Sequence, residues 1–278
     1  MRIGSVLLSL LLLGGCAQAG TMTVAGERQA APPPRFGTPR HFDADLLRYR
    51  LAGTQLRLAG VRHGAPPRLP AVPPPRQVDC KRHKCVALTF DDGPAEFTGQ
   101  VLDLLAAHRA RATFFVLGQM ITDETRGFVR RMASEGHELG NHSWDHASLA
   151  GLSPDALRRE LERTQEAVLK ETGVRMRLMR PPYGATNQTV DNETKQTGLA
   201  QVMWAVDTLD WLNRNPAVIA QRSAAAKPGD IVLMHDIHAT TVQALPRLLD
   251  ELDRKGFTYV TVSELLGDTT PGKKYTNR

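Results

Sequence analysis

The feature that most constrains the fold of this chain is an alternation, starting at Val86, of short apolar runs with longer amphipathic stretches. Short runs rich in Val, Leu, Ile and Phe are typical of buried strands, whereas the longer stretches repeat apolar residues at helical spacing. The runs predict seven strands: Val86–Phe90, Thr113–Leu117, Glu138–Asn141, Leu178–Arg180, Val202–Val206, Ile231–Met234 and Thr258–Val262. Strands that alternate with helices predict a parallel α/β fold, either a barrel or a doubly wound sheet.

The segment after Ser153 carries the signals of one such helix. Ser153 is a suitable N-cap, and Pro154 suits the first helical position because its φ is already fixed near the helical value. The apolar face that follows is made of Leu157, Leu161, Thr164 and Val168. Gly173 lies where this helix is expected to end.

In both folds the active site gathers at the carboxyl ends of the strands, and polar residues are concentrated there in this sequence. Asp91 and Asp92 follow the first predicted strand, where two adjacent carboxylates are costly unless a cation or a partner holds them. His142 and His146 follow the third strand, and their spacing would put both on one face of a helical turn, where they can share a metal. Alone, the Asp pair would also suit a helix cap, and a lone His pair is often structural.

Polar residues also follow the next three predicted strands. Arg180 and Tyr183 come after the fourth strand, separated by two prolines that rigidify the turn. The others are Asp207, Asp210 and Trp211 after the fifth strand and His235 after the sixth. Incidental polar residues would not gather at the same ends of five strands, so this pattern indicates an active site.

At these residues the chain resembles the polysaccharide deacetylase family, the carbohydrate esterases that share a domain with the chitooligosaccharide deacetylases of nodulating bacteria. The five motifs that carry the resemblance are Thr89–Pro94, His142–His146, Arg180–Gly184, Asp207–Trp211 and Ile231–His235. The first two motifs at this separation are highly specific, whereas the last is weak alone. The resemblance covers most of Val86–Leu266 and implies a distorted barrel of about seven βα units. We place this catalytic domain in residues 80–268, followed by a C-terminal tail of residues 269–278.

The resemblance implies a role for each matching residue. Asp92, His142 and His146 match the three ligands of a divalent metal, usually zinc, with cobalt as an alternative. Asp91 matches the general base that takes a proton from the attacking water. Arg180 resembles the residue that pairs with this base and orients it.

The remaining matches concern the leaving group and the substrate. The backbone N–H of Tyr183 corresponds to an oxyanion donor. His235 matches the general acid that protonates the leaving amine. Asp210 resembles the acidic residue that tunes this histidine, with Asp207 as the less favoured alternative. The walls of the substrate pocket are matched by Trp211 and Leu233.

The function that the resemblance implies is removal of N-acetyl groups from a polysaccharide. Peptidoglycan N-acetylhexosamines are the favoured substrate of an exported enzyme, and chitin oligomers and acetylated xylan stay open. One alternative is an acetylxylan esterase, which removes O-acetyl groups by nearly the same chemistry. Another is a glycan-binding protein on an inactive scaffold, which would predict losses among the catalytic residues that the sequence does not show. We expect a monomer and no nucleic-acid binding.

The N-terminus has the pattern of an export signal over residues 1–19. Arg2 makes it positive, and Ile3–Leu13 is an apolar run too short to span a bilayer. Leu13–Cys16 resembles a lipobox, in which Cys16 becomes the lipidated first residue, whereas Ala17–Ala19 is an A-x-A site for cleavage without lipid. We favour the lipobox. Either site predicts an exported protein, held at the bacterial surface as a lipoprotein or secreted.

Residues 20–79 are predicted to be a linker rich in Pro and Arg. Ten of the eighteen prolines lie between residues 20 and 80, which is typical of extended chain. Residues 26–85 carry a net charge of +8, and residues 86–278 carry −3. This basic arm suits binding to anionic lipid or wall polymer, or else it is a solvated linker. Within it, the leucine-rich residues 42–61 suit a small element that docks on the domain or on a membrane.

The three cysteines fit an exported protein, in which disulfides are permitted. If Cys16 is lipidated, Cys80 and Cys85 remain as a pair, either bridged or free. A zinc site made from this pair is not expected, because the sequence has no further Cys to complete it.

Overall fold

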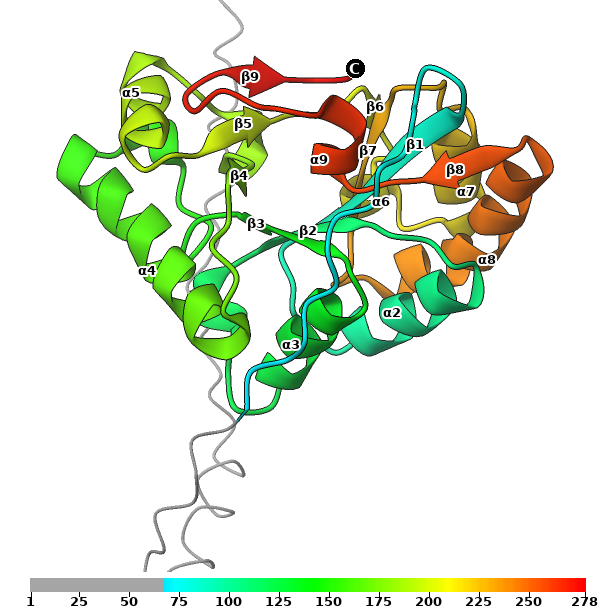
Figure 1. Ribbon diagram of the computed structural model, residues 1–278, viewed down its shortest axis with the longest axis horizontal. Helices are drawn as coiled ribbons and strands as arrows, with labels where there is room; N and C mark the ends of the chain where they lie inside the picture. The colour runs from blue at the N-terminus through cyan, green and yellow to red at the C-terminus, as the bar shows by residue number, and fades with distance from the viewer. Residues whose placement is uncertain (1–67) are drawn as a thin grey trace, which may run out of the picture. The chain divides into compact units, whose positions relative to one another are not determined.

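The computed structural model describes residues 68–278, which form one sheet with helices packed around it (Figure 1). The sheet order is β6-β7-β1-β2-β3-β4-β5-β9, and β8 pairs with the start of β1. All of these strand pairs are parallel. The strands are β1 (Lys84–Asp91), β2 (Thr113–Val116), β3 (Glu138–Asn141), β4 (Leu178–Met179), β5 (Ala200–Val202), β6 (Val206–Asp207), β7 (Ile231–His235), β8 (Phe257–Tyr259) and β9 (Lys274–Tyr275).

Helices connect most of the successive strands and lie around the curled sheet (Figure 1). They are α2 (Thr98–Ala107), α3 (Arg126–Ser134), α4 (Pro154–Thr172), α5 (Gln188–Gln196), α6 (Asp210–Asn213), α7 (Pro216–Ala224), α8 (Ala239–Arg254) and α9 (Val262–Leu266). Three 3₁₀ turns are η1 (Gly118–Met120), η2 (Leu149–Gly151) and η3 (Pro182–Gly184). The helix predicted after Ser153 is confirmed as α4. Ser153 caps its first turn, and Gly173 follows its last turn with a left-handed φ of 74°.

The predicted α/β barrel is confirmed, because β7 lies beside β1 and the strand order is otherwise sequential. Its distortion arises where the sequence predicts one strand over Val202–Val206 and the structure has two, β5 and β6. Between them the N–H of Met203 bonds to a carbonyl of β9, and the N–H of Ala205 bonds to a carbonyl of β7. The chain therefore crosses from one edge of the sheet to the other, and the barrel stays open between its edge strands, β9 and β6.

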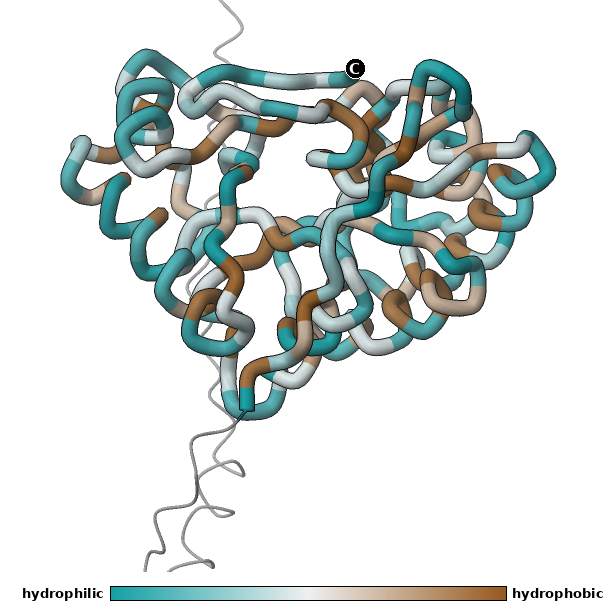
Figure 2. Tube along the Cα trace, viewed as in Figure 1, coloured by the Kyte–Doolittle hydropathy of each residue, from teal (hydrophilic) through white to brown (hydrophobic). Residues whose placement is uncertain are grey.

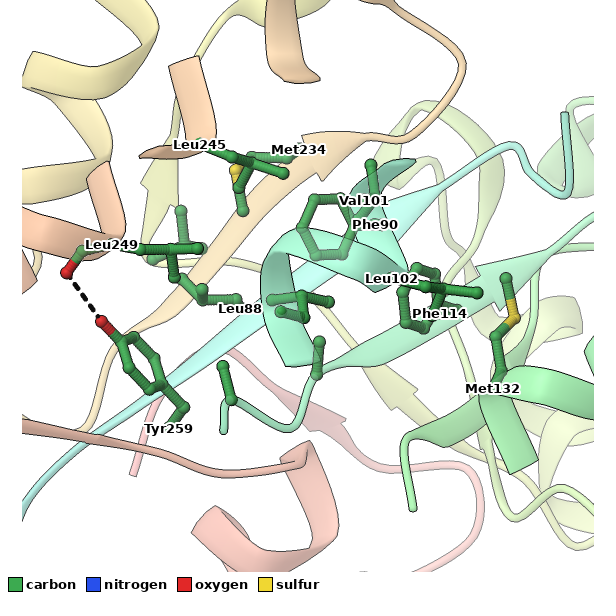
Figure 3. Close-up of a cluster of buried hydrophobic side chains, with 14 of the residues drawn as sticks. Leu88, Phe90, Val101, Leu102, Phe114, Met132, Met234, Leu245, Leu249 and Tyr259 are labelled. Atoms are coloured by element: carbon green, nitrogen blue, oxygen red, sulfur yellow. Dashed lines mark hydrogen bonds between the residues drawn. The ribbon is translucent and has the colours of Figure 1, made fainter. Parts of the chain in front are cut away.

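The side chains of β1 alternate between an outer and an inner apolar core. The outward set is Val86, Leu88 and Phe90, which pack with residues of α2 and α8 (Figure 3). The inward set begins with Cys85 and Ala87, which belong to the core inside the barrel. Since alternate residues of a strand face opposite sides, Thr89 and Asp91 also face the interior. The strand period thus directs one carboxylate of the Asp pair into the barrel.

The hydropathy of the chain follows this division (Figure 2). Apolar segments lie along the strands and on the helix faces that cover them, and polar segments lie in the outer turns and loops. Within residues 68–278, no helix is both long enough and apolar enough to cross a bilayer. The predictions for residues 1–19, for Cys16 and for residues 42–61 lie outside the described residues.

Residues 68–79, which we call the strap, pack on the domain although the sequence places them in the linker. Arg76 donates from Nε and Nη2 to Oε1 and Oε2 of Glu264, at 3.0 and 2.8 Å. The side chain of Glu264 is 2% exposed and also accepts from Arg111 at 3.2 Å. Strap residues line a cavity of about 370 Å³ together with residues that precede β2, β3 and β4. The strap therefore lies at the amino ends of the strands.

Cys80 and Cys85 form a disulfide, which decides between the two states that the sequence leaves open. The bridge closes the turn that leads from the strap into β1, and Cys85 is buried at the start of that strand. The strap, the disulfide and β1 are thus continuous parts of the folded domain.

The ten C-terminal residues, which the sequence places in a tail, contribute to the sheet. β9 pairs with β5, and Asn277 forms an antiparallel bridge with Asp230 just before β7. The N–H of Arg278 donates to the carbonyl of Gly229 at 3.0 Å. The C-terminal segment therefore runs from β5 to the start of β7, the neighbours of the two edge strands β9 and β6 (Figure 1).

The strap contact yields a stability prediction. We expect Arg76→Ala to lower the free energy of unfolding by about 1–3 kcal/mol, because a buried carboxylate loses hydrogen bonds that water cannot replace. Chemical denaturation at pH 7 measures this change. Arg82→Ala is the matched control, since its ion pair with Asp79 is exposed, and it should change stability by less than about 0.5 kcal/mol. Equal effects of the two variants would contradict a structural role for the strap.

Candidate active site

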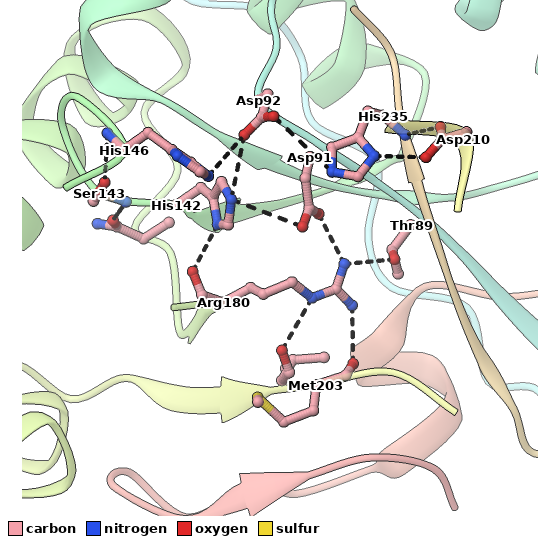
Figure 4. Close-up of polar contacts among 12 residues, drawn as sticks. Thr89, Asp91, Asp92, His142, Ser143, His146, Arg180, Met203, Asp210 and His235 are labelled. Carbon is pink, nitrogen blue, oxygen red and sulfur yellow. Dashed lines mark hydrogen bonds and ion pairs between the residues drawn. The ribbon is translucent and has the colours of Figure 1, made fainter. Parts of the chain in front are cut away.

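Arg180, directly after β4, is fully buried and joins three strands through its guanidinium (Figure 4). Its Nη1 donates to Asp91 Oδ1 at 2.8 Å and to Thr89 Oγ1 at 2.7 Å, both on β1. Its Nε and Nη2 donate to two backbone carbonyls at the end of β5, at 3.0 Å each. The Asp91 carboxylate is thereby fixed through Oδ1, while its Oδ2 lies 3.8 Å from His142 Nε2.

Asp92, His142 and His146 come together beside this pair and could hold a metal (Figure 4). The Nε2 atoms of both histidines lie 3.4 Å from Asp92 Oδ1, and the ligand atoms of the group are within 4.8 Å of one another. His142 Nδ1 lies 2.7 Å from the carbonyl of Arg180. That carbonyl can only accept, so Nδ1 carries a proton, and Nε2 is the ring nitrogen that faces Asp92.

The charge states of this group fit a divalent metal. Burial would raise the pKa of Asp92, but the facing histidines His142, His235 and His146 hold it below its usual range through the positive charge that they carry when protonated. Burial lowers the pKa of His146, against the charge of Asp92. An ionised carboxylate and a neutral imidazole are the forms that bind metal. Asp92 Oδ1 is also buried without a hydrogen-bond partner among the described residues, as expected of a ligand atom.

The histidines meet in a loop rather than on a helical turn, the local structure that their spacing of four would suit. Ser143 and His146 have φ of 76° and 66°, outside the helical range. The N–H of Ser143 donates to Asn141 Oδ1, and the N–H of His146 donates to Ser143 Oγ, at 2.9 and 3.0 Å. Of the seven non-glycine residues with positive φ in the described chain, five are predicted site residues or directly adjoin one: Asp92, Ser143, His146, Tyr183 and Leu209. Backbone strain is thus concentrated at this site.

His235, at the end of β7, faces the metal-binding group from the other side. Its Nδ1 lies 2.7 Å from Asp210 Oδ1, and its Nε2 lies 4.0 Å from Asp92 Oδ2. Burial would lower the pKa of His235, but the hydrogen bond and charge of Asp210, with Asp91 and Asp92, raise it to about 9. The imidazole is therefore protonated at neutral pH and can donate from Nε2.

The two acidic residues that follow β5 in sequence have different surroundings. Asp210 is fully buried, and its Oδ2 accepts from the backbone N–H of His235 and from Thr241 Oγ1, at 2.7 Å each. Asp207 instead accepts the N–H of Leu209 at 2.8 Å. Of the two candidates, Asp210 is therefore the one in contact with His235.

The predicted substrate residues lie around this group with different exposures. Tyr183 is 71% exposed, and its ring packs edge-on against His146 with centroids 4.5 Å apart. Trp211 is 47% exposed and directly follows Asp210. Leu233 is buried on β7 and, being two residues before His235, shares its face of the strand.

The sequence does not predict roles for three residues that contact this site. Thr89 binds Arg180, and its place two residues before Asp91 is a period-two signal that could have identified it. Thr241 binds Asp210 from α8, a contact with no signal in the sequence. Asp236 is fully buried behind the site, and burial raises its pKa to about 7, against a hydrogen bond from Thr98.

Comparison with known proteins places this arrangement among polysaccharide-modifying enzymes. A protein-family model described as polysaccharide deacetylase matches residues 79–202. The chain is 44% identical over 204 residues to peptidoglycan-N-acetylglucosamine deacetylase PgdA of Listeria monocytogenes, which covers 72% of this chain and 43% of that protein. It is 39% identical over 193 residues to a peptidoglycan-N-acetylglucosamine deacetylase of Bacillus cereus, covering 66% and 88%.

A solved structure shows the same fold. The structure of T48 deacetylase with substrate is 42% identical, with a TM-score of 0.68, and the match covers 71% of this chain and 99% of that one. The chain spans less than half the length of the Listeria relative, so the likeness to that protein concerns one part of it.

The contact between His235 and Asp210 yields a pH prediction. Asp210→Asn removes the charge that raises the pKa of His235, so this pKa should fall from about 9 toward the ordinary value of 6.5. If activity needs the protonated imidazole, the alkaline limb of kcat/KM against pH should move to lower pH. Asp207→Asn is the matched control and should keep the parent profile, because Asp207 does not contact His235. Identical profiles for all three proteins would exclude this role of Asp210.

Proposed function

The chain belongs to the polysaccharide deacetylase family, and we propose that it removes N-acetyl groups from peptidoglycan by metal-dependent hydrolysis. The observation that carries the proposal is the position of Asp92, His142 and His146 between two other groups. On one side lies a carboxylate fixed by a buried arginine, and on the other lies a protonated imidazole. A proton acceptor and a proton donor that flank a metal-binding group are what hydrolysis of an amide requires.

Asp92, His142 and His146 are the proposed metal ligands, and zinc is the proposed metal, with cobalt as the alternative. Three protein ligands leave coordination positions open. When bound, the metal would polarise the acetyl carbonyl and lower the pKa of a water molecule. The protein contributes the ligand orientation, since the carbonyl of Arg180 fixes the tautomer of His142.

Asp91 is the proposed general base. Arg180 occupies its Oδ1, which leaves Oδ2 on the side of the metal-binding group as the atom that accepts the proton of the attacking water. The same contact prevents rotation of the carboxylate, so the acceptor atom is in place before substrate binds. Arg180 therefore acts as a positioning residue.

His235 is the proposed general acid, donating from Nε2 to the leaving nitrogen. An amine is too basic to leave as an anion, so it must be protonated as the C–N bond breaks. Asp210 holds the opposite nitrogen of the ring and keeps the imidazole charged. The backbone N–H of Tyr183 is the proposed donor to the oxyanion, and it is the first N–H after Arg180 because the two residues between them are prolines.

The peptidoglycan substrate is supported by the relatives, whose names specify peptidoglycan-N-acetylglucosamine deacetylases. The exposed rings of Tyr183 and Trp211 beside the site suit contact with sugar rings, and buried Leu233 suits contact with the acetyl methyl. All of these residues come from one chain, in keeping with a monomer.

Acetate release tests this function. We expect the protein to release acetate from peptidoglycan, to lose activity with a chelator and to regain it with zinc or cobalt. Asp91→Asn should keep the metal but lower turnover roughly 10²–10⁴-fold, because a positioned proton acceptor is lost. Chitooligosaccharides and acetylxylan complete the substrate panel.

Each other outcome of this experiment has a clear meaning. Release from acetylxylan alone would replace the proposal with an O-acetyl esterase. Glycan binding with no release from any substrate would indicate a binding protein. Loss of metal in Asp91→Asn but not in Asp92→Asn would exchange the roles of the two carboxylates.

We also propose that the protein acts at the cell surface, anchored by lipid on Cys16. The strap joins the domain at the amino ends of the strands, opposite the carboxyl ends where the site lies. The net charge of +8 over residues 26–85 would add attraction to anionic lipid or wall polymer, and this attraction weakens with salt.

Mass spectrometry of the mature N-terminus tests the anchor. We expect an acylated protein that begins at Cys16 and remains with the membrane fraction, because two or more acyl chains hold a protein firmly. Cys16→Ser is the matched variant and should prevent acylation. A soluble protein that begins at Gly20 would exclude the anchor and leave the enzymatic proposal untouched.

A further inference from the structure

Asp236 is a buried carboxyl group that the proposed mechanism does not use. It follows His235 directly after β7, and none of its surface is exposed. Its Oδ2 accepts a hydrogen bond from Thr98 Oγ1, and its Oδ1 has no hydrogen-bond partner among the described residues. Burying a polar group without a partner for each oxygen costs free energy, so the presence of Asp236 at this position needs an explanation.

The Asp236 carboxyl packs directly against Gly93, the residue that follows the proposed metal ligand Asp92. A Cβ added to Gly93 would lie 2.3 Å from Asp236 Oδ2 and 2.4 Å from Oδ1, far inside contact distance. On its other side, the carbonyl of Gly93 accepts the N–H of Leu117 at 3.0 Å. The backbone at Gly93 is thus held between the end of β2 and the Asp236 side chain.

The hydrogen bond to Thr98 extends this support along the loop. Thr98 is the first residue of α2, and its Oγ1 also accepts the N–H of Ala95 at 2.8 Å. The chain of contacts from Asp236 through Thr98 to Ala95 therefore braces the loop that runs from Asp92 to α2. The loop needs bracing, because Asp92 has φ of 75°, a conformation that a non-glycine residue keeps only when its surroundings impose it.

We propose that Asp236 is a positioning residue that holds the turn at Gly93 and thereby fixes the carboxylate of Asp92 for metal binding. It acts through the backbone that carries the ligand, without touching the metal. Because Asp236 also follows His235, it couples the strand that carries the proposed acid to the turn that carries the proposed ligand. The inference rests on the proposed metal site.

Zinc affinity tests this role apart from catalysis. The dissociation constant is measured on metal-free protein by competition with a chromophoric chelator at pH 7, with thermal unfolding recorded alongside. We expect Asp236→Ala to weaken zinc binding about 10–100-fold, the usual effect of removing support behind a ligand. Asp236→Asn should stay close to the parent, because Asn keeps the shape and an acceptor for Thr98.

Gly93→Ala changes the other partner of the contact between Gly93 and Asp236. It therefore tests the contact even if the Asp236→Ala variant fails to fold. The added methyl should displace the turn and weaken zinc binding. In the double variant Gly93→Ala/Asp236→Ala the clash is relieved, so zinc binding should recover relative to Gly93→Ala. Two independent losses of stability would not produce such a recovery.

Two controls separate this inference from its premise. Glu193→Ala removes another buried carboxylate, one that pairs with Arg158 on a different face, and should lower stability without changing zinc affinity. His142→Ala should abolish tight zinc binding, and if it binds like the parent, the proposed metal site is wrong. If His142→Ala behaves as expected but Asp236→Ala and Gly93→Ala bind zinc as tightly as the parent, only the role of Asp236 is overturned.

Discussion

The structure depends on the buried charge of Arg180 inside a barrel whose strands are mostly apolar. An uncompensated guanidinium there would cost several kcal/mol, so its partners are structural requirements as much as parts of a site. One partner is the Asp91 carboxylate on β1, and two are carbonyls where β5 ends and the chain leaves the sheet. Arg180, which follows β4, thus ties β1 to the point where the chain leaves β5. The proposed base is also the counter-ion of the fold, which explains how a carboxylate can be held immobile in the interior.

The sequence predicts those parts of the fold and the site that depend on local patterns of apolar, capping and polar residues. The apolar run before Asp91 predicts a buried strand, and the structure confirms it as β1. The cap at Ser153 and the stop at Gly173 predict α4 at both ends. The concentration of polar residues at strand ends predicts the place of the site, because parallel strands deliver their carboxyl ends to one edge of the sheet. The roles of the individual side chains came from family resemblance and remain proposals.

Other parts of the structure depend on contacts between residues that are distant in the sequence, and the sequence alone could not predict them. The strap looks like a linker because it is rich in proline, yet Arg76 ties it to Glu264 of α9. β9 has only two residues in a polar segment, so no apolar pattern marks it. The conformation of the loop that carries His142 and His146 could not be predicted for a different reason. Its spacing suits a helical turn, but Asn141 and Ser143 offer side-chain acceptors to the backbone that compete with helix formation.

The two adjacent aspartates show how strain and function are joined. In a regular strand, neighbouring side chains face opposite sides, so a continued β1 would send Asp92 outward when Asp91 faces inward. The left-handed φ of Asp92 ends the strand and breaks this alternation, and both carboxylates come to lie within 4 Å of His142 Nε2. Their mutual repulsion is reduced because Arg180 neutralises Asp91, while Asp92 faces the histidines with which it could hold a metal. The strained turn is therefore what makes two sequence neighbours into a base and a ligand of one site, and the buried groups behind Gly93 are what keep it strained.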